Sequence, residues 1–146
     1  ANKHYIMSHL QNDLKNWFEY DVKIENRQVQ CYKLIATDSA KVKLISTGGK
    51  TGLETQSSFI GFRMVNSPLY VLLIHLNSGI GNHRDILTLN ETGIKQNIDL
   101  DLGMDCPMDD FDQVKKRLNK NGLDIIKSTT EMKVLVISDP AITSTN

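Results

Sequence analysis

From residue 59 onward, the spacing of apolar residues switches repeatedly between the two-residue repeat of a strand and the 3.6-residue repeat of a helix. Residues 66–81 and 108–122 have the helical repeat. The predicted strands cover 59–65, 85–90, 97–104, 123–128 and 132–138. The last two are predicted to pair as a hairpin across Thr129–Glu131, and the polar tail from Asp139 is predicted to fray. The resulting order, βαββαββ, predicts an α+β fold with helices packed on small antiparallel or mixed sheets.

Both predicted helices carry signals that start and end a helix. In the first, Ser67 is the predicted N-cap, Pro68 suits the first turn, and Gly79 and Gly81 end the helix. In the second, aspartates gather at the amino end and basic residues in the carboxyl half, an order that stabilises the helix dipole. Gly122 closes this helix. The leucine-lined faces of both helices are therefore expected in the core.

Residues 1–57 are predicted to form a smaller subdomain of one helix and a β-hairpin. An amphipathic helix is expected between 5 and 20, with a buried face formed by Ile6, Met7, Leu10, Leu14, Trp17 and Phe18. Residues 21–26 and 29–37 are predicted to pair across Asn26 and Arg27, with a further strand at 41–46. The Gly/Ser/Thr-rich loop 46–58 marks the boundary with residues 58–146, although both subdomains are expected to share one compact unit. The whole chain would then hold about three helices.

The charge balance disfavours nucleic acid as a partner. Lys plus Arg and Asp plus Glu both number 17, so no net field attracts DNA, RNA or an acidic membrane surface. The longest apolar stretch, Leu69–Leu76, is far shorter than the roughly 20 residues of a membrane span. No basic-then-apolar leader opens the sequence. We therefore expect no nucleic-acid partner and no membrane insertion of this chain.

The cysteines and histidines show no metal-binding spacing. Cys31 and Cys106 match neither a zinc site nor a CxxC redox motif, and we interpret them as separate, half-buried thiols. A single disulfide is the alternative if the protein is exported. No histidine has a second one four residues away, the spacing that would place two ligands side by side. The histidines are His4, His9, His75 and His83. The sequence thus predicts no metal and no cofactor.

Asp99 and Asp101 are the strongest candidates for a charged site. They alternate with apolar residues in a predicted strand, so both side chains leave the same face, which Asp105 would join. Three carboxylates can bind calcium, but the glycine and glutamate of the calcium-binding loop are missing. A strand also spaces such ligands about 7 Å apart. We interpret the aspartates as the solvent-exposed face of the strand.

No catalytic motif is present in the sequence. The stretch TGGKTG at 47–52 is similar to the end of a phosphate-binding loop, but Leu44 stands where that motif requires a glycine. No GxSxG, SxxK or HExxH motif occurs. The chain is therefore predicted not to be an enzyme, and a hydrolase with scattered catalytic residues is the weaker alternative.

Two dipeptides and their surroundings resemble a known family. Thr92-Gly93 lies in the segment LNETGIKQNIDLDL, and Gly122-Leu123 lies between a helix and strands at 111–139. Together with 7–35 and 66–76, these segments resemble, in order, an uncharacterised bacterial domain-of-unknown-function family described as soil-associated. The chain departs from the family pattern where members usually have aspartate, leucine and an aromatic residue; these positions hold Asn90, Ile94 and Ile98.

The second half, from about Ser58 to Asp139, also resembles the short amino-terminal domain of secretins and TonB-dependent receptors. Such domains have the same βαββαββ order, lie in the periplasm, bind partner proteins and are not enzymes. Domains similar to the soil-associated family are found alone after a secretion leader, beside thioredoxin-like TlpA-type domains in Bacteroidetes, or on BlaR-type sensor peptidases. The resemblance implies a periplasmic or cell-surface protein, and it carries over no catalytic residue.

From these observations we expect a non-catalytic binding module of the cell envelope. Its partner would be an envelope protein or a peptide, bound by pairing to a sheet edge or by docking on a surface. The alternative is an accessory domain of a larger thiol-redox or sensor-peptidase protein. The signature residues are expected to be structural: Thr92 and Gly93 make a turn between two strands, Gly93 with a positive φ, and Gly122-Leu123 links helix to strand.

Overall fold

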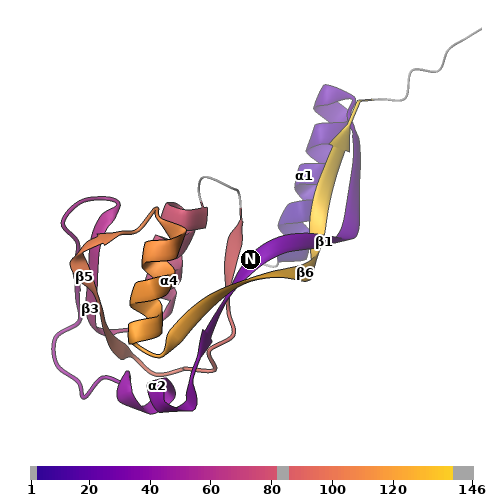
Figure 1. Cartoon of the computed structure of the whole chain (residues 1–146). Helices are drawn as coiled ribbons and strands as arrows, with labels where there is room; N and C mark the ends of the chain where they lie inside the picture. Colours follow the sequence, from indigo (N-terminus) through magenta and orange to yellow (C-terminus); the bar gives the residue numbers. More distant parts are fainter. Residues whose placement is uncertain (1–2, 82–85, 140–146) are drawn as a thin grey trace, which may run out of the picture. The chain divides into compact units, whose positions relative to one another are not determined.

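The computed structural model describes residues 3–81 and 86–139. By its contacts the chain divides into two compact units: unit 2 is Gln30–Thr129, and unit 1 combines Ala1–Val29 with Thr130–Asn146. Two long strands, β1 (Asp21–Ala36) and β6 (Leu123–Ser138), contribute residues to both units (Figure 1). Residue 57, where the sequence suggests a boundary, lies inside unit 2.

The structure confirms the predicted α+β class. One sheet has the strand order β4-β1-β6, with β4 (Leu87–Asn90) parallel to β1. The other sheet is antiparallel, in the order β2-β3-β5, and its strands are Gly52–Glu54, Ile60–Ser67 and Ile98–Pro107. The helices are α1 (Lys3–Phe18), α2 (Asp38–Lys43), α3 (Tyr70–Leu76) with a π-helical turn η1 (Asn77–Gly81), and α4 (Phe111–Lys120).

Both predicted hairpins are wrong. The chain continues as strand through Asn26-Arg27 in β1 and through Thr129–Glu131 in β6, and the two long strands are neighbours in one sheet (Figure 1). Neither break contains the glycine that a two-residue hairpin turn needs. Threonine favours strands, and a polar side chain in a strand simply points to solvent. The order after residue 59 is therefore βαββαβ.

The predicted strand at 41–46 is wrong as well: its first half belongs to α2, and in its second half Ile45 makes only an isolated β-bridge to Ile98. The hydroxyl oxygen of Thr37 caps this helix by accepting the Ala40 N–H at 3.2 Å. Asp38 lies in its first turn and lysines in its last, as the helix dipole favours.

Helix α3 begins later than predicted, and after Leu76 it continues as the π-helical turn η1 to Gly81, the predicted end of the helix. Ser67 is not its N-cap: it is the last residue of β3, and its hydroxyl donates to the Val65 carbonyl at 2.9 Å. Leu69 takes the cap position without a side-chain hydrogen bond, and both predicted terminating glycines lie in η1. The predicted strand at 85–90 is shorter at its start, where Asp85 lies outside the described residues, as does most of the predicted tail.

The core of unit 2 confirms the inward face predicted for both helices. Side chains from both sheets, α3 and α4 form one buried cluster, which includes Tyr32, Leu34, Phe62, Met64, Leu72, Leu76, Ile98, Leu102, Val114 and Leu118. Helix α4 packs on β5. Burial of this many large apolar side chains accounts for the stability of unit 2, at about 1.5–3 kcal/mol for each.

Unit 1 contains α1 and the parts of β1 and β6 that belong to it. The amide of Gln11 in α1 donates to the Val22 carbonyl in β1 at 2.8 Å, which fixes the helix against the strand. Met7 and Leu14 are half-buried. Among the described residues of unit 1, Val22 is the only fully buried apolar residue. Unit 1 therefore has a very small core.

Candidate functional site

The Thr92-Gly93 signature forms a tight, internally bonded turn between β4 and β5. The side-chain oxygen of Asn90 accepts the Thr92 N–H at 3.0 Å and the Thr92 hydroxyl at 2.7 Å. The same hydroxyl oxygen accepts the N–H of Ile94 at 3.1 Å. Gly93 has φ 74°, the positive value that most residues avoid. The N–H and the hydroxyl of Thr92 are both used inside the turn.

The Gly122-Leu123 signature joins α4 to β6. Gly122 also has φ 74°, and its carbonyl accepts the Thr37 N–H at 2.9 Å. A β-carbon at this position would lie 2.8 Å from the Cβ of Ala40, so the site requires glycine for space as well as for φ. Leu123 is buried in the core. This pair positions α2 against the end of α4.

The three aspartates of β5 do not converge on a metal. Asp101 and Asp105 are exposed, as predicted, but all three carboxylates bond to the protein. The Asp101 carboxylate accepts the Gly103 N–H at 2.8 Å and lies 3.6 Å from the Arg63 guanidinium. Within residues 3–81 and 86–139, no group of three or more His, Cys, Asp or Glu side chains could hold a metal ion.

Arg117 in α4 holds Asp105 in a two-pronged ion pair. Its two terminal nitrogens donate to the two carboxylate oxygens at 2.9 and 3.1 Å, and one of them also donates to the Leu102 carbonyl at 3.0 Å. The hydrogen bond with Arg117 lowers the pKa of Asp105. This contact fastens α4 to β5 and leaves no oxygen of Asp105 free of a charged partner.

Asp99 is half-buried, so its predicted place on a purely solvent-exposed face is wrong. Its carboxylate accepts the Asn66 N–H at 2.7 Å. Asn66 has φ 44°, an unusual value for a residue with a side chain, and the hydrogen bond stabilises that conformation. The same bond, assisted by Ser46, lowers the pKa of Asp99. Asp99 is thus an anchor for the end of β3.

This anchor gives stability a defined dependence on pH. Because the folded-state pKa of Asp99 is below its unfolded value, its contribution is present above about pH 4 and is lost as the pH falls further. Asp99→Asn should therefore be less stable than wild type at pH 7, and the difference should shrink on acidification below pH 4. Urea unfolding across this range measures it. If the free energies of unfolding of the two proteins ran parallel across this pH range, the charge of Asp99 would contribute nothing to stability.

The segment similar to a phosphate-binding loop is tied to β3. The Asn66 amide donates to the Gly49 carbonyl at 2.6 Å, and the Thr51 hydroxyl donates to the Asn66 carbonyl at 3.2 Å. Strand β2, not a helix, begins at Gly52. The helix N-terminus that would hold a phosphate is therefore missing after this described loop.

The histidines occupy separate surroundings. His9 packs against Tyr5, with ring centroids 4.3 Å apart. His75 packs edge-on against Phe62 at 5.1 Å, and its Nδ1 lies 2.9 Å from the Val71 carbonyl. His83 and the side chain of His4 lie outside the described residues. The two histidine side chains that are described thus each have a packing partner.

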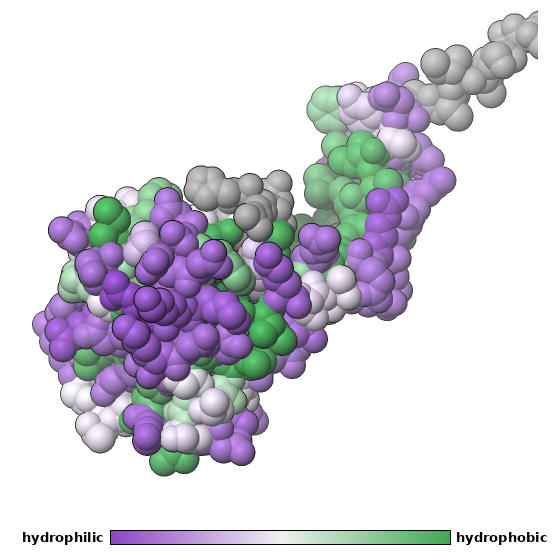
Figure 2. Space-filling model, in the orientation of Figure 1, coloured by the Kyte–Doolittle hydropathy of each residue, from purple (hydrophilic) through white to green (hydrophobic). Residues whose placement is uncertain are grey.

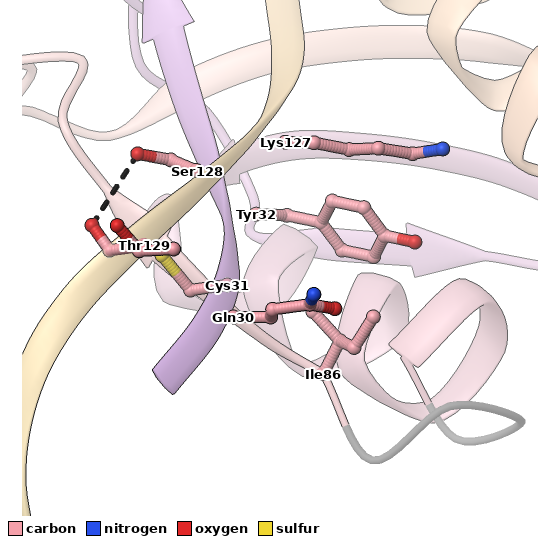
Figure 3. Close-up of a pocket in the computed structure, with 7 residues that line it drawn as sticks. All are labelled: Gln30, Cys31, Tyr32, Ile86, Lys127, Ser128 and Thr129. Atoms are coloured by element: carbon pink, nitrogen blue, oxygen red, sulfur yellow. Dashed lines mark hydrogen bonds between the residues drawn. The ribbon is translucent and has the colours of Figure 1, made fainter. Parts of the chain in front are cut away.

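A hollow of about 340 Å³ lies in unit 2 beside Tyr32 (Figure 3). Its lining consists of Gln30, Cys31, Tyr32, Ile86, Lys127, Ser128 and Thr129. The Tyr32 ring is buried and packs on Phe111 at 5.0 Å, and the Lys127 ammonium lies 5.3 Å from the centre of the Phe111 ring. Among the described lining residues there is no carboxylate and no histidine.

Both cysteines are free and fully buried, which corrects the expectation that they are half-buried and leaves them unpaired with each other. Burial raises the pKa of the Cys106 thiol. A buried, protonated thiol is a poor nucleophile, because the thiolate is the reactive form. Cys31 lines the hollow beside Tyr32 (Figure 3). In the structure, the Cys106 side chain belongs to the buried core of unit 2, and the Cys31 side chain is buried as well.

Helix α1 has an uncovered apolar side, which is the most distinctive surface of the described residues. Ile6, Leu10 and Trp17 lie within about 40° of one another around the helix. We call these three residues the α1 flank. Their exposed fractions are 55%, 47% and 79%. Figure 2 shows hydrophobic surface in the part of the molecule that contains α1. A contiguous apolar surface of this kind is typical of interaction sites.

The burial predicted for the α1 face is therefore mostly wrong. Only Met7 and Leu14 of the predicted apolar residues are half-buried, whereas the α1 flank and Phe18 are exposed. The sequence pattern identified the apolar stripe. It could not show that the strands beside α1 cover only one side of that stripe.

No family model, no curated protein and no solved structure matches this chain. In the part of the chain that the structure describes, none of the helices combines the length and the apolar character that crossing a bilayer requires.

Proposed function

We propose that this chain is a non-catalytic protein-interaction module of the cell envelope, and that unit 1 makes the contact. The observation that carries the proposal is the exposed α1 flank. Tryptophan is a common anchor of protein interfaces, and exposure of large apolar side chains to water is unfavourable. The β5 carboxylates support this proposal indirectly, since each of them is bonded to other groups of the protein.

The small core of unit 1 also supports a need for a partner. Two strands alone are marginally stable in water, and they become stable when further strands or a packed helix extend the apolar contact. In unit 1 one helix packs on two strands, yet only Val22 is fully buried among its described apolar residues. A bound protein would increase this burial.

The proposed location rests on the resemblance to the soil-associated family and to the short domains of secretins and TonB-dependent receptors. Those proteins act in the periplasm or at the cell surface. A contact surface suits such domains, which bind partner proteins rather than transform substrates. The proposed partner is accordingly another protein chain of the same compartment.

Photo-crosslinking in the cells that make the protein tests the contact. The photoreactive residue p-benzoylphenylalanine replaces Phe18, next to the α1 flank, or Tyr70, in unit 2 as a matched control. The two side chains are similar in size and exposure, at 63% and 60%. Adducts with protein are expected at position 18 and not at position 70. Equal adducts at both positions, or none at 18, would contradict the proposal.

Replacing Leu10 or Trp17 by serine in the crosslinking protein should reduce these adducts several-fold. The free energy of unfolding of the isolated chain should change by less than about 1 kcal/mol, because both side chains are already exposed. Urea unfolding of the purified variants measures it. A loss of several kcal/mol would instead show that the α1 flank belongs to the core of the isolated chain.

A further inference from the structure

Strand β6 lies at the edge of its sheet. In the order β4-β1-β6, its only strand neighbour among the described residues is β1. An edge strand presents unpaired N–H and C=O groups, and native proteins cover such edges or block them with charge or proline. The two ends of β6 differ in this respect.

Side chains of α4 cover the start of β6 in unit 2. Lys115 donates to the Ile125 carbonyl at 2.9 Å and forms an ion pair with Asp124. The amide nitrogen of Asn119, turned toward the strand, lies 2.9 Å from the Leu123 carbonyl oxygen. Two successive outward carbonyls are thus satisfied, which prevents another strand from pairing there.

The part of β6 in unit 1 lacks this protection. Among the described residues, no side chain is bonded to the backbone of 130–137 on the edge away from β1. Residues 130–138 (TEMKVLVIS) contain no proline, most of them favour strands, and their only two charges, on Glu131 and Lys133, are opposite in sign. This segment has the properties of an edge that pairs with another strand.

We infer that a second copy of this chain pairs with β6 of unit 1 in antiparallel orientation, with Met132 opposite Met132 of the partner subunit. This inference names the partner in the proposed function and rests on it. In a symmetric antiparallel pair, residues whose numbers add up to a constant are opposite each other. With Met132 at the axis, Glu131 lies opposite the partner's Lys133, and the symmetric pair repeats this contact.

Charge selects this register over its neighbours. A shift of the axis by one residue would place Glu131 opposite the partner's Glu131, or Lys133 opposite the partner's Lys133. Like charges directly opposite each other destabilise a strand pair, and opposite charges stabilise it. Glu131 and Lys133 are both exposed, whereas Met132 and Val134 are half-buried, so the two charges share the open face of the strand.

The same pairing also determines where the two copies of α1 lie. A two-fold axis perpendicular to the sheet keeps both copies of α1 on one face of the enlarged sheet. The two copies of β6 then lie at the centre of a four-stranded sheet, where neither is an edge strand. The balanced total of 17 basic and 17 acidic residues means that no net charge repels the copies.

Sedimentation equilibrium of the full chain tests the inference. Wild type is expected to be a reversible dimer at micromolar concentration. Glu131→Lys or Lys133→Glu turns both cross-strand pairs into like-charge pairs and should weaken dimerisation about 10- to 30-fold. The double variant, which exchanges the charges, should return to within about 3-fold of wild type. An equimolar mixture of the two single variants should form a mixed dimer.

The controls carry the same changes in charge on α2 of unit 2: Asp38→Lys and Lys43→Glu should leave dimerisation within about 3-fold of wild type. If a reversal unfolds the chain, Glu131→Gln and Lys133→Gln should still weaken the dimer about 3-fold. A monomeric wild type, equal effects of reversals and controls, or a mixture no tighter than its components would overturn the inference.

The crosslinks at position 18 separate the two proposals. Adducts with twice the mass of the chain support both the proposed function and the second copy as partner. Adducts with a different protein, together with a monomer in the centrifuge, overturn the second copy as partner and leave the interaction module standing. Absence of adducts at position 18 overturns the proposed function itself.

Discussion

Replacing Tyr32 by alanine is expected to lower the free energy of unfolding by about 3–5 kcal/mol, the range for deleting a large buried aromatic side chain. Tyr32 lies on β1, where it is in register with Thr88 of β4, and its ring packs on Phe111 of α4. The substitution would therefore leave a cavity where a sheet meets a helix. Urea or thermal unfolding, followed by circular dichroism, measures the loss.

Tyr32→Phe is the matched control, because it keeps the ring and removes only the hydroxyl group. Its effect should be below about 1.5 kcal/mol. If phenylalanine were as destabilising as alanine, the hydroxyl group rather than the ring would hold the packing. If alanine cost less than about 1 kcal/mol, the hollow beside Tyr32 would have to close around the smaller side chain.

Gly122→Ala is expected to lower the free energy of unfolding by about 2–5 kcal/mol. The positive φ of 74° costs an alanine about 1–2 kcal/mol. The new β-carbon would also lie 2.8 Å from the Cβ of Ala40 and 2.9 Å from the hydroxyl oxygen of Thr37. Relieving that overlap requires α2 and its N-cap to move away from position 122, which adds about 1–3 kcal/mol. Urea unfolding monitors the change.

Gly93→Ala separates the two causes, because Gly93 has the same φ of 74° but no atom within 4 Å of the point that a β-carbon would occupy. It should cost only the backbone strain, about 1–2 kcal/mol. If both variants lowered the free energy of unfolding equally, α2 would be able to shift at no energetic cost. The positive φ alone would then require glycine at both positions.

The class of fold was predictable because hydrophobic periodicity records which side of an element is buried. The faces of α3 and α4 and the apolar positions of β5 follow from that pattern. Strand continuity was not predictable in the same way. Polar pairs such as Asn26-Arg27 interrupt the apolar pattern whether the chain turns or continues through solvent. The absence of glycine was the signal that favoured continuation.

The sequence contains a helix N-cap signal before α2, but the alternating apolar residues after it led to the prediction of a strand. Thr37 followed by Asp38 is a helix start, yet the alternation in KVKLIS suggested a strand. The opposite error occurred at Ser67, where a serine before a proline has the composition of a cap. In the structure its hydroxyl bonds within β3, since the strand extends to that residue.

The candidate site could be predicted only in part. Helical spacing identified the apolar residues of α1, and it also predicted their burial, which requires a surface large enough to cover them. That surface depends on which strands lie beside the helix, and therefore on the pairing of β1 with β6, which is far away in sequence. Asp99 was missed as an anchor because its partner, Asn66, lies in another strand.

The division of the chain sets an order for its synthesis and folding. Unit 1 contains residues from both sides of unit 2, so α1 leaves the ribosome long before the second half of β6 exists. All of Gln30–Thr129 is made in between and can fold first, since domains fold as units while synthesis continues. During that interval the first part of β1 can lie beside α1, but the second half of β6 is missing, so unit 1 stays incomplete and the α1 flank stays exposed. Chaperone binding to the nascent chain is therefore expected at its first helix.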